Sequence, residues 1–185
     1  MRKGMHTASM KDFREVKAGS KWLKRDYVAI MLWFVGRAIQ AAAAMDEAVK
    51  KEFEELPEGF TFSLGVMPNG PHMIVGKSKR GIVHYMGWDP AGKNITLSMK
   101  IKNIEAAVLL FTFQESTAVA TARDRLIVDG EVPHACAVVR ILDIVEVYLL
   151  PKFIAKLAVK RYPVEAPYIN LFRRVVLYVR TVFGF

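Results

Sequence analysis

Apolar residues are concentrated most strongly in residues 121–150. Residues 126–128 form a short apolar run that ends in an Asp-Gly pair, which is typical of a strand followed by a tight turn. Pro133 then stands where a helix would begin, because a residue in the first helical turn needs no hydrogen-bond donor. We therefore expect a strand, a turn and a helix that runs from residue 135 to residue 150.

The expected helix is apolar over most of its circumference. Its only charged residues are Arg140, Asp143 and Glu146, which are spaced by three. A surface helix has a single apolar stripe, so this helix must be covered on several sides by protein, by a bound apolar ligand or by a membrane. We interpret its three charged residues as a solvated cluster.

Apolar periodicity predicts helices in two other places. A spacing of three and four over residues 21–56 predicts one long helix, with a bend at Gly36 and an end at residues 57–59. Residues 104–114 are again very apolar, and Asn103 can cap them as a helix. Their β propensity makes a strand the alternative.

Between these helices the apolar period changes to two, which predicts strands. The alternation is clearest in residues 60–66 and 94–101. Shorter apolar runs at residues 73–75 and 81–86 flank a basic turn. Together with residues 125–128, these runs predict a sheet of about five strands.

This order of elements resembles the sterol carrier protein type 2 superfamily. The similar segments are residues 60–67, 81–86, 94–101 and, most specifically, 126–131, which read Leu-Ile-Val-Asp-Gly-Glu. In that family a strand, a Gly-acidic pair and an apolar helix close the sheet, and here the order is Asp-Gly-Glu. The resemblance covers about residues 40–150.

The resemblance implies an α+β fold, in which about five largely antiparallel strands are covered by helices on one face and enclose an apolar tunnel. The tunnel would hold a lipid, a fatty acyl chain or an isoprenoid-like ligand. The small bacterial members of the superfamily include accessory lipid carriers for quinone synthesis, and this chain is similar to them in size. We expect a polar tail at residues 1–20, one domain at 21–150 and a basic amphipathic extension at 151–185, which has no counterpart in the family core.

The two apolar helices at residues 104–114 and 135–150 are the candidate lipid site. A tunnel removes a lipid chain from water at about 0.8 kcal/mol per CH₂ and needs wall side chains without polar atoms. The simpler alternative is that these side chains pack on the sheet. The candidate wall residues are Val108, Leu109, Phe111, Phe113, Val138, Ile141, Leu142, Val145 and Leu149.

Positive charge gathers at the two ends of the chain. Residues 1–30 carry eight Lys/Arg against three Asp/Glu, and residues 151–185 carry seven against one, whereas the net charge of the whole chain is +9. Such ends suit an anionic membrane surface, although a solvated basic face over a packed helix is the alternative. Nucleic-acid binding is disfavoured because no recognition motif accompanies the charge. The residues predicted to contact a membrane are Lys152, Lys156, Lys160, Arg173, Arg174 and Arg180.

No constellation of catalytic or metal-ligating residues is evident. The four histidines show no ligand spacing with each other or with Cys136, and the sequence has neither a phosphate loop nor a nucleophile elbow. We therefore expect no catalytic residue, metal or cofactor. As the single cysteine, Cys136 excludes an intramolecular disulfide, fits a reducing compartment and is expected to be a small core residue.

Residues 27–45 come closest to a membrane span. Arg37 and Gln40 lie well inside this segment, and a central arginine costs about 2.5–3.5 kcal/mol on insertion. A buried amphipathic helix is therefore favoured, and no secretory signal is evident.

The sequence predicts a non-catalytic protein that binds and transfers a lipid, in the cytoplasm and peripheral to a membrane. The alternative is an interaction or scaffold module that forms a homodimer or docks a partner through its apolar helices. An enzyme that uses the tunnel for an acyl or steroid substrate would need polar groups that the sequence does not reveal.

Overall fold

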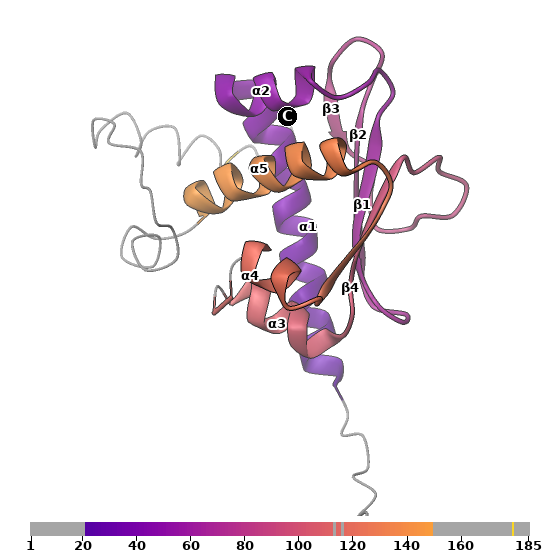
Figure 1. Cartoon of the computed structure of the whole chain (residues 1–185), viewed down its shortest axis with the longest axis vertical. Helices are drawn as coiled ribbons and strands as arrows, with labels where there is room; N and C mark the ends of the chain where they lie inside the picture. The colour runs from indigo at the N-terminus through magenta and orange to yellow at the C-terminus, as the bar shows by residue number, and fades with distance from the viewer. Residues whose placement is uncertain (1–20, 113, 116, 150–178, 180–185) are drawn as a thin grey trace, which may run out of the picture.

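The structure is a computed structural model that describes residues 21–112, 114–115, 117–149 and 179. It confirms the predicted α+β fold class (Figure 1). In chain order the elements are α1 (Trp22–Met45), α2 (Glu47–Glu54), β1 (Thr61–Val66), β2 (His72–Lys77), β3 (Val83–Tyr85), β4 (Leu97–Ile101), α3 (Ile104–Phe111), α4 (Thr117–Ala122), β5 (Leu126–Asp129) and α5 (Val132–Leu149).

The five strands form one sheet in the order β3-β2-β1-β4-β5. β1 pairs with β2 antiparallel and with β4 parallel, so that Leu64 lies opposite Met73 on one side and Met99 on the other. The β2–β3 and β4–β5 pairs are also antiparallel. The sheet is therefore mixed and largely antiparallel, as predicted.

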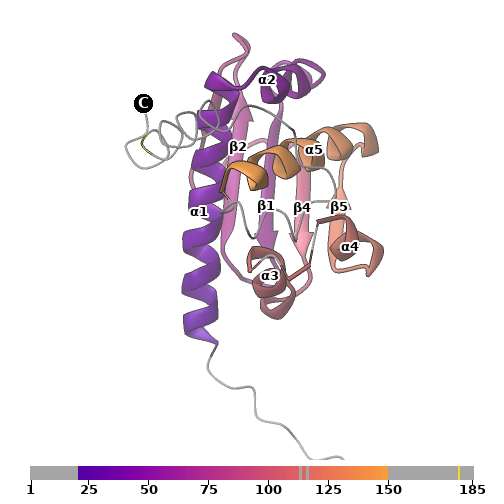
Figure 2. The same ribbon diagram turned by 90° about the vertical axis from the view of Figure 1, so that its left-hand side faces the viewer.

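The helices lie on one side of the sheet, which agrees with the prediction. Figure 2 shows α1 running along the sheet on the β2 side and α5 crossing in front of the strands. Fully buried apolar side chains from both helices and from the strands meet between these layers and form the core. Those that define it are Val28, Leu32, Ile39, Phe62, Met99, Val138, Ile141 and Val145.

Among the described residues, the opposite face of the sheet is covered by side chains and a loop rather than by a helix. The His72 ring lies over β1, where a Cβ on Gly65 would come within 2.0 Å of it, and Met86 approaches Gly76 of β2 in the same way. Figure 1 shows the connection between β3 and β4 on this side. Small residues on the central strands thus leave room for side chains of the neighbouring strand and loop.

The prediction of one helix over residues 21–56 is wrong, because the chain breaks at Asp46. This residue is extended (φ −108°, ψ 120°) and caps α2, with its Oδ1 accepting hydrogen bonds from the N–H groups of Ala48 (2.8 Å) and Val49 (3.1 Å). Gly36 lies inside α1, and its role is close packing rather than the predicted bend. A Cβ at this position would come within 2.6 Å of the Tyr85 ring, so glycine allows β3 to approach the helix closely.

The other predicted elements are present with shifted ends. Asn103 caps α3 as expected, with its Oδ1 accepting from the N–H of Ala106 at 2.8 Å, and residues 104–111 are helical rather than extended. Pro133 lies in the first turn of α5, as predicted. The short helix α4 was not predicted, because its Thr-, Val- and Ala-rich sequence has no clear apolar stripe.

Candidate functional site

A narrow apolar pocket lies between the sheet and the helices. Its volume is about 20 Å³, which suffices for a water-sized molecule but not for an acyl chain. Three strands and four helices contribute to its walls. The lining residues are Val35, Leu64, Met99, Leu110, Phe111, Thr117, Leu126, Leu142, Val145 and Glu146.

The structure brings three of the nine predicted wall residues to this pocket, namely Phe111, Leu142 and Val145. Val138 and Ile141 are fully buried on the same helix but belong to the packed core. On α3, Val108 and Leu109 are partly exposed. Phe113 and the side chain of Leu149 lie outside the described residues.

The sequence did not indicate the rest of the lining. Val35 comes from α1, whose apolar pattern predicted only a buried helix, and Leu64 and Met99 come from the central strands. Thr117 lies in α4, the helix that was not predicted. Strand side chains alternate between two faces, and the sequence alone does not show which face meets a pocket.

The three charged residues of α5 do not form the predicted solvated cluster. Arg140 pairs with Glu52 at 2.8 Å and with Glu55 at 3.0 Å, and so ties α5 to α2. Asp143 is exposed, whereas Glu146 lies in the pocket wall. A helix turns by about 100° per residue, so side chains spaced by three drift around the axis and can reach different neighbours.

Glu146 is the one carboxyl group in the pocket lining. Its Oε1 accepts a hydrogen bond of 3.4 Å from the hydroxyl of Thr117, a residue that is itself buried. Burial, with a smaller contribution from Asp143, raises the pKa of the Glu146 carboxyl to about 7, against an opposing effect of the Thr117 hydrogen bond. Near neutral pH this group therefore exists in both its neutral and its charged form.

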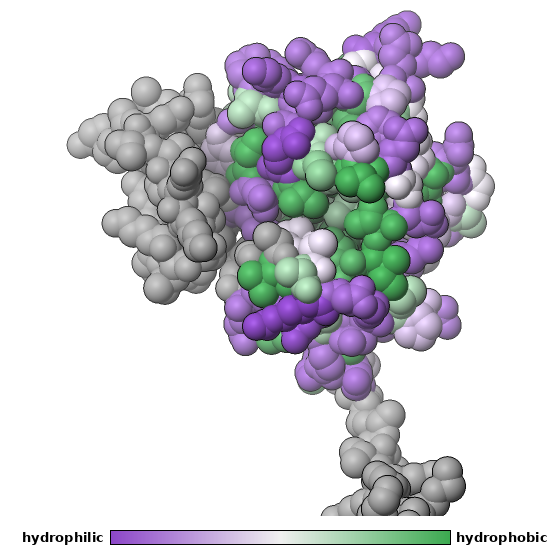
Figure 3. All heavy atoms as spheres, in the orientation of Figure 1, coloured by the Kyte–Doolittle hydropathy of each residue, from purple (hydrophilic) through white to green (hydrophobic). Residues whose placement is uncertain are grey.

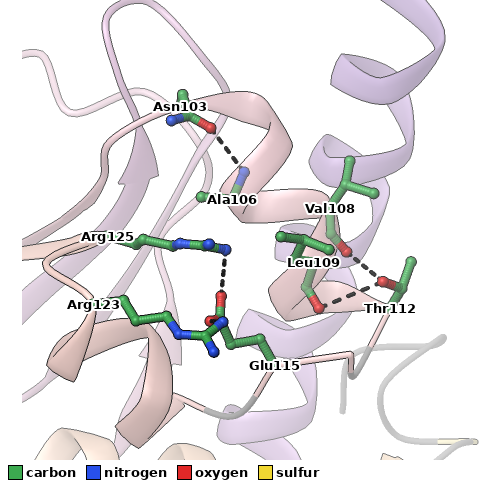
Figure 4. A network of polar contacts seen from close by, with 8 residues as sticks. All are labelled: Asn103, Ala106, Val108, Leu109, Thr112, Glu115, Arg123 and Arg125. Carbon is green, nitrogen blue, oxygen red and sulfur yellow. Dashed lines mark hydrogen bonds and ion pairs between the residues drawn. The ribbon is translucent and has the colours of Figure 1, made fainter.

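A second buried carboxylate, Glu115, stands just before α4. Figure 4 shows it between the guanidinium groups of Arg123 and Arg125, each of which contacts one of its oxygens at 2.7 Å. These two ion pairs connect the start of α4 to the segment that leads into β5.

Apolar side chains reach the surface between α5 and α4, beside β5. Figure 3 shows this region on the same face of the molecule as Figure 1. The pocket lining includes Thr117 from α4, Leu126 from β5 and Leu142 from α5. The apolar lining thus borders an apolar strip of surface.

Two larger hollows, of about 470 and 430 Å³, lie beside the N-terminal half of α1 and open to solvent. The first lies between Trp22 and the turn after β1, which contains the cis peptide bond Met67-Pro68. The second is aromatic and is lined in part by Trp33, Tyr85 and Trp88. Both hollows share Arg25, so the two form adjoining parts of one groove.

Within the described part of the chain, α1 is the one helix whose length and composition would allow it to cross a membrane. Nearly half of its most apolar window is buried in the domain, against β2, β3, α3 and α5.

The described histidine and cysteine side chains either pack against neighbouring residues or are exposed. His134 packs against the Phe60 ring with 5.4 Å between ring centres. Cys136 is exposed, so its predicted place in the core is wrong. Among the described residues, no three His, Cys, Asp or Glu side chains gather as they would around a metal ion. The six basic residues predicted to contact a membrane lie outside the described residues.

The sequence matches no protein-family model and no curated protein. Among solved structures, the chain is similar to a UbiJ-SCP2 ubiquinone synthesis protein, with a TM-score of 0.42 and 13% identity over 68% of this chain and 97% of that one. It is also similar to the sterol carrier protein domain 2 of Helicoverpa armigera, with a TM-score of 0.38 and 16% identity over 71% of this chain and 94% of that one.

A third similar structure is the sterol carrier protein 2-like 2 of Aedes aegypti, with a TM-score of 0.32 and 11% identity over 54% of this chain and 94% of that one. All three of these solved structures are described as SCP2 or sterol carrier protein domains.

Proposed function

We propose that this protein binds a lipid or another long apolar molecule and carries it without chemical change. The observation that carries the proposal is the pocket between sheet and helices, in which Thr117 and Glu146 are the two polar members of an otherwise apolar lining. Burying an apolar chain there would yield about 0.8 kcal/mol per CH₂. The resemblance of the sequence to the sterol carrier protein type 2 superfamily supports the same function.

Binding requires the pocket to widen, because its volume is about 20 Å³. Two of the helices around it, α3 and α4, have eight and six residues. Helices of this length are marginal on their own, so they depend on packing and can shift at modest cost. We therefore propose that a ligand enters between α4 and α5, where apolar side chains reach the surface.

Native mass spectrometry of the gently purified full chain tests this function. We expect a bound apolar molecule, or uptake of one when mixed lipids are offered. Leu142→Trp should fill the pocket and reduce occupancy severalfold, because Leu142 is buried in its wall. The matched control is Val132→Trp on the same helix, at a position that is 70% exposed.

An empty chain that takes up no lipid would contradict the proposal. Equal occupancy in both tryptophan variants would place the ligand elsewhere. Far-UV circular dichroism of each variant would show that the fold is kept, since an added ring in a core costs about 1–3 kcal/mol.

We further propose that the protein works in the cytoplasm and that its basic C-terminal extension contacts anionic lipid. The support is the sequence, which places Lys152, Lys156 and Lys160 at a spacing of four among apolar residues. Each basic residue near an anionic surface contributes about 1 kcal/mol.

Co-sedimentation with vesicles tests this contact. Replacing the three lysines by glutamine should weaken binding to phosphatidylserine-containing vesicles by about a hundredfold, since three such contributions multiply. The control is the triple variant at the exposed positions Lys51, Lys79 and Arg80, which should bind nearly as the native chain does. Equal loss in both variants would indicate only an effect of net charge.

The second candidate function is an interaction module, and the outer face of α1 favours it. Trp22, Leu23 and Ile30 are each more than half exposed on this face, at 59%, 64% and 63%. An apolar face of this kind on a soluble domain marks an interaction site. Light scattering distinguishes the two functions: a concentration-independent dimer that Ile30→Glu separates, without lipid uptake, supports the module.

A further inference from the structure

The pocket is polar at one point, and its described lining holds no cation there. Of its ten described lining residues, Thr117 and Glu146 alone carry polar side chains, and they contact each other. Their O···O distance of 3.4 Å is long for an O–H···O hydrogen bond, which is usually near 2.7–2.8 Å. A ligand oxygen placed between them would therefore make better hydrogen bonds than they make with each other.

Among the described residues, no positively charged group lowers the pKa of Glu146. On α5, Asp143 is the charged residue that affects the pKa of Glu146, and it is negative. Arg140 of the same helix is paired with Glu52 and Glu55 of α2.

On the α4 side, Glu115 engages Arg123 and Arg125. On α1, the Tyr27 hydroxyl donates to the carbonyl of Phe111 at 3.0 Å. The sheet contributes Leu64, Met99 and Leu126, which are apolar.

An anionic head group in this pocket would therefore meet the Glu146 carboxylate, with the negative Asp143 on the same helix, and no counter-ion among the described residues. Placing two like charges together in an apolar site is costly, and so is burying one charge unpaired. A neutral oxygen meets no such cost. It can accept from the Thr117 hydroxyl or from the neutral Glu146 carboxyl, and a ligand hydroxyl can donate to the charged carboxylate.

We propose that Glu146 and Thr117 recognise the head of the ligand, and that the pocket takes neutral oxygenated lipids, such as long-chain alcohols or carbonyl compounds, in preference to fatty acid anions. This inference rests on the proposed lipid-binding function and adds the chemical class of the ligand. Because burial raises the pKa of Glu146, the discrimination against anions should be strongest above neutral pH, where this carboxyl is charged.

Two probes with the same chain length test the inference, namely 1-hexadecanol and palmitate. The affinity of each probe is measured by its displacement of the neutral dye Nile red from the full-length protein. The two affinities are compared at about pH 8, where Glu146 is mostly charged. We expect hexadecanol to bind at least about tenfold more tightly than palmitate. Hexadecane is the control, because its affinity measures the contribution of the alkyl chain without a head group.

Two variants locate the effect. Glu146→Gln keeps the shape and removes the charge, so it should strengthen palmitate binding by about tenfold and leave hexadecanol nearly unchanged. Thr117→Val keeps the shape and removes the hydroxyl, so it should weaken hexadecanol binding severalfold without affecting hexadecane. Glu58→Gln, at an exposed position, should match the native chain.

Equal affinity of the native chain for palmitate and hexadecanol would overturn the inference and leave lipid binding intact. An unchanged ratio in Glu146→Gln would also overturn it, since the selectivity would then come from elsewhere. Failure of all three probes to displace the dye, with no lipid bound to the purified protein, would instead overturn the proposed function itself.

Discussion

Glu115 illustrates how a single carboxylate stabilises this domain. Its side chain is 4% exposed and is shared by Arg123 and Arg125. A buried carboxylate needs a partner, because burying an unpaired charge costs several kcal/mol. Either arginine can meet this need, and the carboxylate is left unpaired only when both are removed.

We expect Arg123→Ala and Arg125→Ala to lower the free energy of unfolding by about 1 kcal/mol each. The double variant should lose more than the sum, about 3–5 kcal/mol, because it leaves Glu115 buried without a partner. Urea unfolding of the native chain, the two single variants and the double variant measures this double-mutant cycle, provided that the free energy of unfolding depends on urea concentration with the same slope in all four. Additive losses would mean that water already solvates Glu115.

Glu146 should make stability depend on pH. Its folded-state pKa of about 7 lies above the ordinary 4.5, so between these values the unfolded chain releases a proton that the folded chain keeps. Stability is therefore expected to fall as pH rises through this interval, by up to about 3 kcal/mol at 1.36 kcal/mol per pKa unit. Urea unfolding of the native chain and of Glu146→Gln across this interval should show a larger decrease in the native chain than in the variant, which keeps Asp143, whose pKa is also raised by burial.

The control is Glu58→Gln, which should follow the native pH dependence because its side chain is exposed. A constant difference between the native chain and Glu146→Gln at all pH values would contradict the prediction. It would mean that Glu146 is solvated in the folded protein.

At the scale of elements, the sequence predicted those whose signals are local. The Asn103 side chain caps α3 and Pro133 suits the first turn of α5, so each residue marks a helix start by itself. The alternation of apolar and polar residues in strands follows directly from the pleat. The Asp46 break was missed because the apolar spacing continues across it into α2. The role of Glu146 could not be predicted, since it depends on α4, which packs close by only in the folded chain.

Asp46 joins three helices. It ends α1, caps α2 through Oδ1, and accepts a hydrogen bond from the Tyr148 hydroxyl of α5 at Oδ2. Asp46→Ala should lower the free energy of unfolding by about 1–2 kcal/mol, because both the cap and the link to α5 are lost. Asp46→Asn keeps a capping oxygen and should cost less.

Tyr148→Phe removes the hydrogen bond between α5 and Asp46 while keeping the α2 cap, and it provides the matched comparison for urea unfolding. Its loss should account for part of the Asp46→Ala effect. If Asp46→Asn proved as destabilising as Asp46→Ala, charge rather than capping would be the main contribution of Asp46.

At the scale of the whole molecule, the domain combines a well-packed sheet with a less stable helical cover. The central strand of the sheet, β1, is buried along its whole length between β2 and β4. The cover includes α3 and α4, which are short helices at the lower edge of the sheet in Figure 2. The pocket lies between these two parts, so its opening should be governed by the cover.

Amide hydrogen exchange should reveal this division. Exchange follows local opening, and short helices that border a pocket open at lower free energy than a central strand. We expect the amides of α3 and α4 to exchange at least about a hundredfold faster than those of β1, which corresponds to a difference of about 2.7 kcal/mol in opening free energy.

A bound neutral lipid should slow exchange in α3, α4 and the adjacent part of α5, because a ligand that fills the pocket stabilises the closed cover. Exchange mass spectrometry with and without 1-hexadecanol measures both effects. Uniform protection across β1, α3 and α4 would instead indicate that the domain opens only by global unfolding, and a ligand could then not enter by local displacement of the cover.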